Sequence, residues 1–161
     1  SVNAPWATPG AYTVRLTVDG KTYSQPLTLK MDPRVHTPIA GLSQLYTLSN
    51  EMYALAISTH AAYEQARAQV AATSDPVRKA QLEAIAPAPS AGGAGRGGRG
   101  GFGAAAPVGP PSLSAASSAA LAAAMAMQSA DYAPDANEIA ACEHARAQAN
   151  AVLARWTALK K

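Results

Sequence analysis

The sequence predicts an α+β protein in which a β-hairpin precedes a set of helices, and three observations lead to this fold class. Apolar residues alternate with polar ones over about residues 11–31, the period of a strand with one buried face. From residue 39 onward they recur at three- and four-residue spacing, the period of a helix with one apolar stripe. Residues 86–111 are rich in glycine and proline and hold almost nothing that could form a core. We therefore expect a hairpin followed by an antiparallel three-helix bundle with a disordered insertion.

Composition restricts the classes of protein that fit. Alanine supplies 40 of the 161 residues, while Leu, Ile, Val and Phe together number 25, so close packing of helices through small side chains is expected. The net charge of +3 is too small for disorder by charge repulsion. No apolar run approaches the roughly 18–20 residues of a membrane span. The single cysteine, Cys142, excludes an internal disulfide framework and a zinc site built from cysteines.

The hairpin has a specific turn and a row of large apolar residues. Tyr12–Val18 reads as the first strand, Asp19-Gly20 as a tight I′ turn, and 21–31 as the return strand. Pro26 cannot donate to a ladder, which predicts an edge strand or a bulge there. Two strands alone are marginal in water. We expect upstream strands to cover the apolar face, so that 1–33 would be the C-terminal hairpin of an Ig-like module and the chain part of a larger protein without its own signal peptide.

Residues 34–161 are predicted to form the helical unit. Thr37 is expected to cap a helix that begins at Pro38 and ends near Thr73. Ser74-Asp75-Pro76 reads as a stop and a new N-cap, with a short helical continuation to Ile85. A flexible linker at 87–111 interrupts the unit. Ser112 caps a second long helix ending near Ala130, and Asp135 or Pro134 opens the last helix.

The apolar stripe of the last helix suggests its core contacts. It contains Ile139, Cys142, Leu153 and Trp156. We expect Trp156, Leu153 and Ile139 to pack against the first helix at Leu42, Tyr46 and Met52 or their neighbours.

One segment matches a nucleic-acid-binding pattern of the RGG type. Arg96, Arg99 and Phe102 lie among glycines, and arginine can contact phosphate while phenylalanine stacks on bases. The segment has two repeats only and its flanks are not basic. A solvated loop is the favoured interpretation, with nucleic-acid binding as the alternative.

The remaining candidates have simpler structural interpretations. A metal or acid–base cluster of His60, Glu143 and His144 is conceivable, but no HExxH or Glu-x-x-His pairing is present. Cys142 lies on an apolar stripe and reads as a buried, inert thiol. Tyr46, Tyr53 and Tyr63, with Trp156 opposite, read as core, and a carbohydrate-binding surface is the alternative. We predict no catalytic, cofactor or metal site.

Residues 5–35 resemble the Ig-like hairpin near the C-terminus of a group of large bacterial proteins; the block reads PWATPGAYTVRLTVDGKTYSQPLTLKMDPRV. These proteins are classed as glycosyl hydrolases or sortilin-type proteins, and they carry Asp-box (BNR) β-propeller repeats. The runs LYTLSNEMYALAIS and SADYAPDANE…LARWTALKK resemble their helical tail. The resemblance implies export to the periplasm or the exterior and an accessory, non-catalytic role beside an upstream propeller of the same chain. The family's catalytic positions have no counterpart here, so no site residue is carried over.

Overall fold

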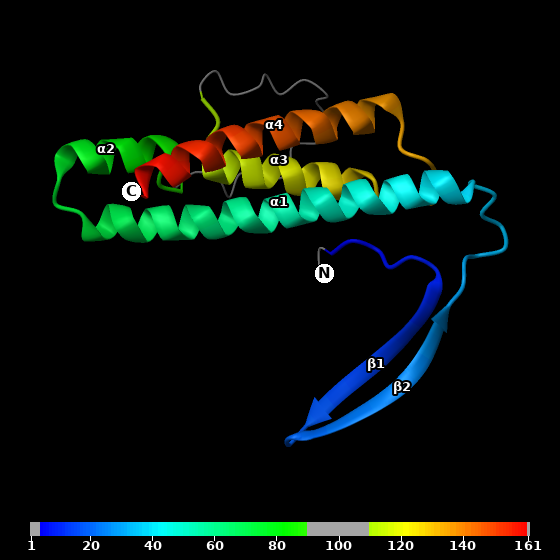
Figure 1. The fold of residues 1–161 in the computed structure, drawn as a ribbon. Helices are drawn as coiled ribbons and strands as arrows, with labels where there is room; N and C mark the ends of the chain where they lie inside the picture. Colours follow the sequence, from blue (N-terminus) through cyan, green and yellow to red (C-terminus); the bar gives the residue numbers. More distant parts are fainter. Residues whose placement is uncertain (1–3, 90–109, 161) are drawn as a thin grey trace.

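The computed structural model describes residues 4–89 and 110–160, and this part of the chain has the expected α+β character. An antiparallel hairpin of β1 (Gly10–Val18) and β2 (Lys21–Leu29) precedes four helices. The helices are α1 (Ile39–Ala72), α2 (Pro76–Ile85), α3 (Leu113–Ala126) and α4 (Ala136–Leu159). Helices α1, α3 and α4 lie side by side, and the hairpin extends away from them (Figure 1).

The hairpin forms as its alternation and turn residues predict. Asp19 and Gly20 have φ angles of 50° and 75°, the positive values that an I′ turn requires. Glycine adopts this conformation without strain, and aspartate tolerates it better than most residues. The strand register runs without interruption from Gly10 paired with Leu29 to Val18 paired with Lys21. Pro26 therefore lies in an edge strand and not at a bulge.

Three of the predicted helix caps are confirmed. The side chain of Asp75 accepts from the backbone N–H of Val77 at 2.9 Å, and Ser112 accepts from that of Ala115 at 3.2 Å. Asp135 forms a capping box with Glu138. Each cap satisfies a backbone donor that would otherwise have no partner in the first turn. The stop and new N-cap predicted at Ser74-Asp75-Pro76 are found, and the short segment that follows is the separate helix α2.

The expected cap at Thr37 is wrong. Pro38 occupies the N-cap position of α1, and the side chain of Thr37 makes no capping hydrogen bond. Its hydroxyl donates instead to the carbonyl of Asp131 at 2.5 Å. Thr37 therefore joins the connector after β2 to the turn between α3 and α4.

The core consists of two clusters along the helices. One surrounds Trp156 and the other surrounds Met52. Helices α1 and α4 run in the same direction and α3 runs against them (Figure 1). The C-terminal end of α4 therefore meets the C-terminal half of α1, and Trp156 packs in the cluster that contains Tyr63 and Val70. The expected contact of Trp156 with the start of α1 is wrong for this reason. The Met52 cluster instead receives Cys142 and Ala145 from α4.

Candidate interaction surface on the hairpin

The register separates the hairpin into an apolar and a polar face. Residues that pair across an antiparallel ladder point to the same side, and successive residues of one strand alternate. One side, here called the apolar face, carries seven large apolar residues together with Gly10, Lys21 and Gln25. The seven are Tyr12, Val14, Leu16, Val18, Tyr23, Leu27 and Leu29. The other carries small or polar residues and the positive charge of Arg15: Ala11, Thr13, Arg15, Thr17, Thr22, Ser24, Pro26 and Thr28. The pattern is that of a strand pair built to bury one face.

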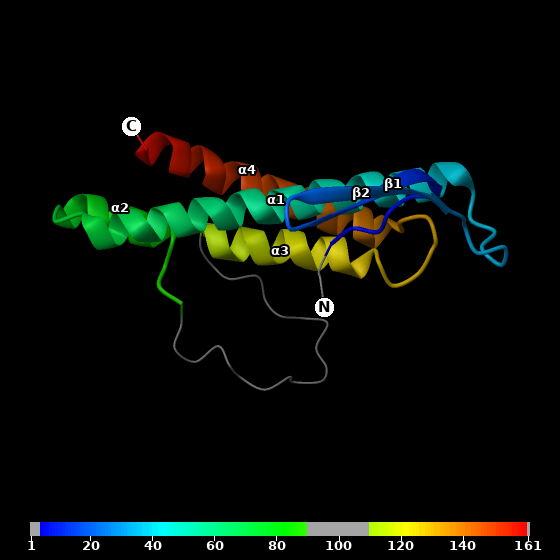
Figure 2. The same cartoon turned by 90° about the horizontal axis from the view of Figure 1, so that it is seen from below.

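The apolar face is open to solvent along its whole length. At the base, Tyr12 and Leu29 are 38% and 37% exposed. Nearer the turn, Leu16 and Tyr23 are 59% and 58% exposed. Figure 1 shows the hairpin diverging from α1, and every large apolar side chain of this face is exposed. In Figure 2, seen from below, the hairpin crosses α1 on this side of the helices. Large apolar side chains gathered on one exposed surface are typical of an interaction site.

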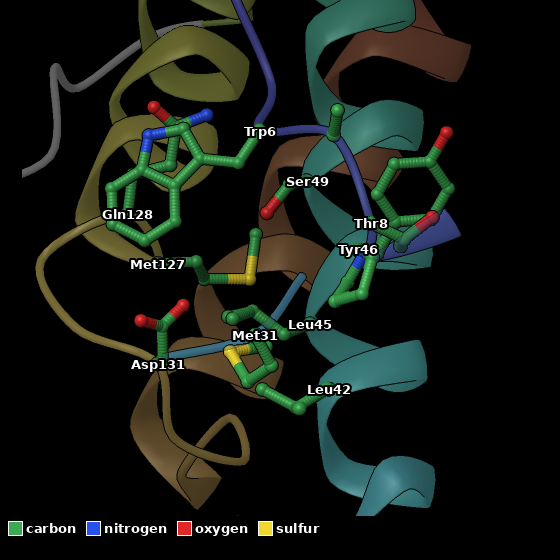
Figure 3. Close-up of a pocket in the computed structure, with 12 residues that line it drawn as sticks. Trp6, Thr8, Met31, Leu42, Leu45, Tyr46, Ser49, Met127, Gln128 and Asp131 are labelled. Carbon is green, nitrogen blue, oxygen red and sulfur yellow. The ribbon is translucent and has the colours of Figure 1, made fainter. Parts of the chain in front are cut away.

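The base of the hairpin is anchored to the helices around a small cavity. Trp6 before β1 and Met31 after β2 line it together with Leu42 and Leu45 of α1 and Met127 (Figure 3). Its volume of about 50 Å³ has room for water and not for a larger ligand.

Polar contacts reinforce this anchor. The Gln128 side chain donates to the carbonyl of Ala4 at 3.0 Å, in addition to the bond from Thr37 to Asp131 described above. The sequence patterns did not predict this anchor, although Met31 continues the alternation of β2 and could have indicated it.

The residues of the RGG-type segment, Arg96, Arg99 and Phe102, lie outside the described residues, as does most of the expected linker. The two histidines of the conceivable metal cluster are not brought together. His60 stacks on Tyr63 and lies beside Glu64, whereas His144 is hydrogen-bonded to Gln148 at 2.8 Å. Over residues 4–89 and 110–160, no three His, Cys, Asp or Glu side chains are grouped as metal ligands would be.

Cys142 is fully buried, as expected for an inert thiol. Its Sγ lies 3.9 Å from the sulfur of Met127. Burial raises the pKa of the Cys142 thiol, which disfavours the reactive thiolate.

The three tyrosines of α1 do not form one platform. Tyr63 is buried and donates to the carbonyl of Pro87 at 3.1 Å, and Trp156 belongs to the same core cluster. Tyr46 lies at the anchor cavity, while Tyr53 lines a shallow groove of about 470 Å³ between α1 and α3. The core interpretation therefore holds for Tyr63 and Trp156, and Tyr46 and Tyr53 face separate depressions.

An ion pair that the sequence did not reveal joins α1 to α4. Arg146 donates from its guanidinium to Glu51, with Nη2 at 2.7 Å from Oε2, in a two-pronged arrangement. The hydrogen bond from Arg146 lowers the pKa of Glu51, and the same bond raises that of Arg146. The two side chains bind each other through two hydrogen bonds, so we interpret the pair as a structural contact between helices.

No protein-family model, curated protein or solved structure matches the chain. Within the described residues, every helix is too short or too polar to cross a membrane. The case for function therefore depends on the surface itself, of which the apolar face of the hairpin is the most distinctive part.

Proposed function

We propose that this chain is a non-catalytic accessory module that docks the apolar face of its hairpin onto a neighbouring β-domain. One observation carries the proposal: side chains such as Leu16 and Tyr23 stand in solvent on the face that their alternation marks for burial. Burying a large apolar side chain contributes about 1.5–3 kcal/mol, so covering this face would stabilise the hairpin by several kcal/mol. A two-stranded sheet otherwise has little stability in water.

The resemblance of residues 5–35 indicates which domain this is. The hairpin would be the last one of an Ig-like sandwich, whose upstream strands would cover the apolar face. This module would stand beside the upstream β-propeller region of an exported bacterial protein of the glycosyl hydrolase class, in the periplasm or outside the cell. The helices would form a three-helix bundle in which α2 and α3 together make the returning leg.

The complete gene and a dye-binding experiment test the proposal. We expect Asp-box repeats to be encoded upstream of Ser1. The isolated chain should bind the apolar dye ANS, Leu16→Asp should reduce the dye fluorescence severalfold, and Thr17→Asp, on the polar face of the same strand, should leave it unchanged.

In the longer protein the neighbouring domain should cover the apolar face. As long as that domain stays docked, neither substitution should alter dye binding. The isolated chain should also hydrolyse no glycoside. A start codon close upstream of Ser1, or equal effects of the two substitutions, would contradict the accessory role.

A further inference from the structure

The two outer edges of the hairpin differ in their capacity to accept another strand. Val18 and Lys21 flank the turn and form a hydrogen-bonded pair, and hydrogen-bonded and non-hydrogen-bonded pairs alternate from there. Counting along the register places Thr13 and Pro26 in a non-hydrogen-bonded pair. The backbone groups of both residues therefore point away from the partner strand. Pro26 removes a donor from the outer edge of β2 without weakening the ladder to β1.

The outer edge of β1 is open. By the same count, the residues whose backbone groups point outward are Ala11, Thr13, Arg15 and Thr17. In the described part of the chain, none of the backbone hydrogen bonds of turns, loops and caps involves these four residues. All of β1 is exposed, so no helix covers this edge. Such a row of unpaired donors and acceptors is a template for a further strand.

We propose that β1 pairs antiparallel with β1 of a second copy, around a two-fold axis at Val14, to give a four-stranded sheet in the order β2-β1-β1-β2. This register places outward-pointing Thr13 opposite Arg15 of the second copy, so that they exchange hydrogen bonds. Tyr12 then faces Leu16 of the second copy, an aromatic–aliphatic pair of a kind that stabilises sheets.

Charge selects this register from its neighbours. A shift by two residues in one direction places Arg15 directly opposite Arg15 of the second copy, and like charges in that position are destabilising. A shift in the other direction leaves Thr17 and Val18 without partners. The register centred on Val14 pairs the whole of Gly10–Val18 and separates the two arginines.

Pro26 limits the assembly to two copies. The pairing is isologous, because each copy contributes the same edge. The outer strands of the resulting sheet are both β2, and Pro26 interrupts the donors of each outer edge, which stops further addition. The apolar faces stay on one side of the sheet, so dimerisation through the edge leaves them free for the docking described above. The dimer uses the outer edge of β1, whereas the proposed docking uses the apolar face. An upstream strand of the Ig-like sandwich that paired with this edge would exclude the dimer in the longer protein, so the test uses the chain as it stands.

Sedimentation velocity of the whole chain tests the pairing with two matched prolines. One strand per copy is a small interface, so the dimer should be weak and should appear between about 10 µM and about 1 mM chain. Thr13→Pro removes an outward donor from β1 and should weaken dimerisation at least about tenfold. Ser24→Pro introduces the same residue at an outward position of β2, and dimerisation should be unchanged.

A second pair of variants avoids proline strain. Val14→Lys places two ammonium groups against each other at the two-fold axis and should abolish the dimer. Gln25→Lys changes the residue that pairs with Val14 on the same face, away from the axis, and should leave the dimer intact. Hydrogen exchange at Leu16 and Tyr23, which pair across the ladder, reports that the hairpin persists in each variant.

A wild-type chain that stays monomeric over this range, oligomers larger than a dimer, or equal responses within either pair of variants would overturn the proposal. A dimer sensitive to Thr13→Pro and Val14→Lys, and insensitive to both controls, would support it.

Discussion

Among single residues, Trp156 carries the clearest energetic prediction. Its side chain is 3% exposed and lies in the cluster to which all four helices contribute. Trp156→Ala removes a large buried ring and should lower the free energy of unfolding by about 3–5 kcal/mol in urea titrations. Ile57, exposed on α1, provides the control, and Ile57→Ala should change stability by less than about 1 kcal/mol. A comparably small loss for Trp156→Ala would place the indole outside the core.

The ion pair of Glu51 with Arg146 should make the free energy of unfolding depend on pH. Because Arg146 lowers its pKa in the folded chain, Glu51 contributes stability that is present above its unfolded pKa of about 4.3 and lost as pH falls through the folded value. Glu51→Gln should therefore destabilise the chain by up to about 1 kcal/mol at pH 7 and by nothing near pH 2.

Urea unfolding at several pH values measures this difference. Glu64→Gln is the matched control, since Glu64 lies beside His60 on the exposed side of α1 and pairs with no arginine in the described part of the chain. A deficit in Glu51→Gln that persists unchanged at low pH would show that the pair is not its cause.

At the scale of elements, local patterns predicted what local contacts determine. The hairpin and the caps at Asp75, Ser112 and Asp135 depend on residues within a few positions of one another, and all are found. The predicted cap at Thr37 is wrong because the hydroxyl of Thr37 donates to the carbonyl of Asp131, which lies far along the chain. The predicted packing partners of Trp156 are wrong because the apolar periodicity identifies the buried face of a helix but not the direction in which the neighbouring helix runs. The apolar face was predicted, but that it stands open is a property of the assembled molecule.

The last helix offers a direct test of capping. The Asp135 carboxylate accepts from the N–H of Glu138 at 2.8 Å, while the Glu138 carboxylate accepts from the N–H of Asp135 at 3.0 Å. Asp135→Ala should lower the free energy of unfolding by about 1 kcal/mol, and Asp135→Ser should recover most of it. Equal losses in the two variants, measured by thermal unfolding, would contradict the cap.

For the whole molecule, the charge argues against tight nucleic-acid binding. Arg96 and Arg99 lie in a chain with a net charge of only +3, so few counterions can be displaced from a bound strand. Filter binding should detect single-stranded RNA weakly at low salt and not at about 150 mM, with little further change in the Arg96→Ala, Arg99→Ala double variant. Submicromolar binding at that salt, lost in the double variant, would instead establish the RGG-type function.

The hairpin and the helices should open separately, because the two core clusters draw their residues from the segment between Leu45 and Trp156. The hairpin is held to them chiefly at its base, around Trp6 and Met31. Native-state hydrogen exchange should therefore give the amides of Leu16 and Tyr23 a lower opening free energy than amides in α1 and α4. Leu16→Asp should lower the hairpin value and leave the urea midpoint of the helices unchanged.

The same hydrogen-exchange measurement, repeated at several chain concentrations, also tests the dimer. If β1 pairs with a second copy, protection of the outward amides of β1 should rise with concentration, while protection in the helices stays constant. A single opening free energy shared by strands and helices at every concentration would mean that the hairpin is an integral part of the helical fold, and that its apolar face does not await a partner.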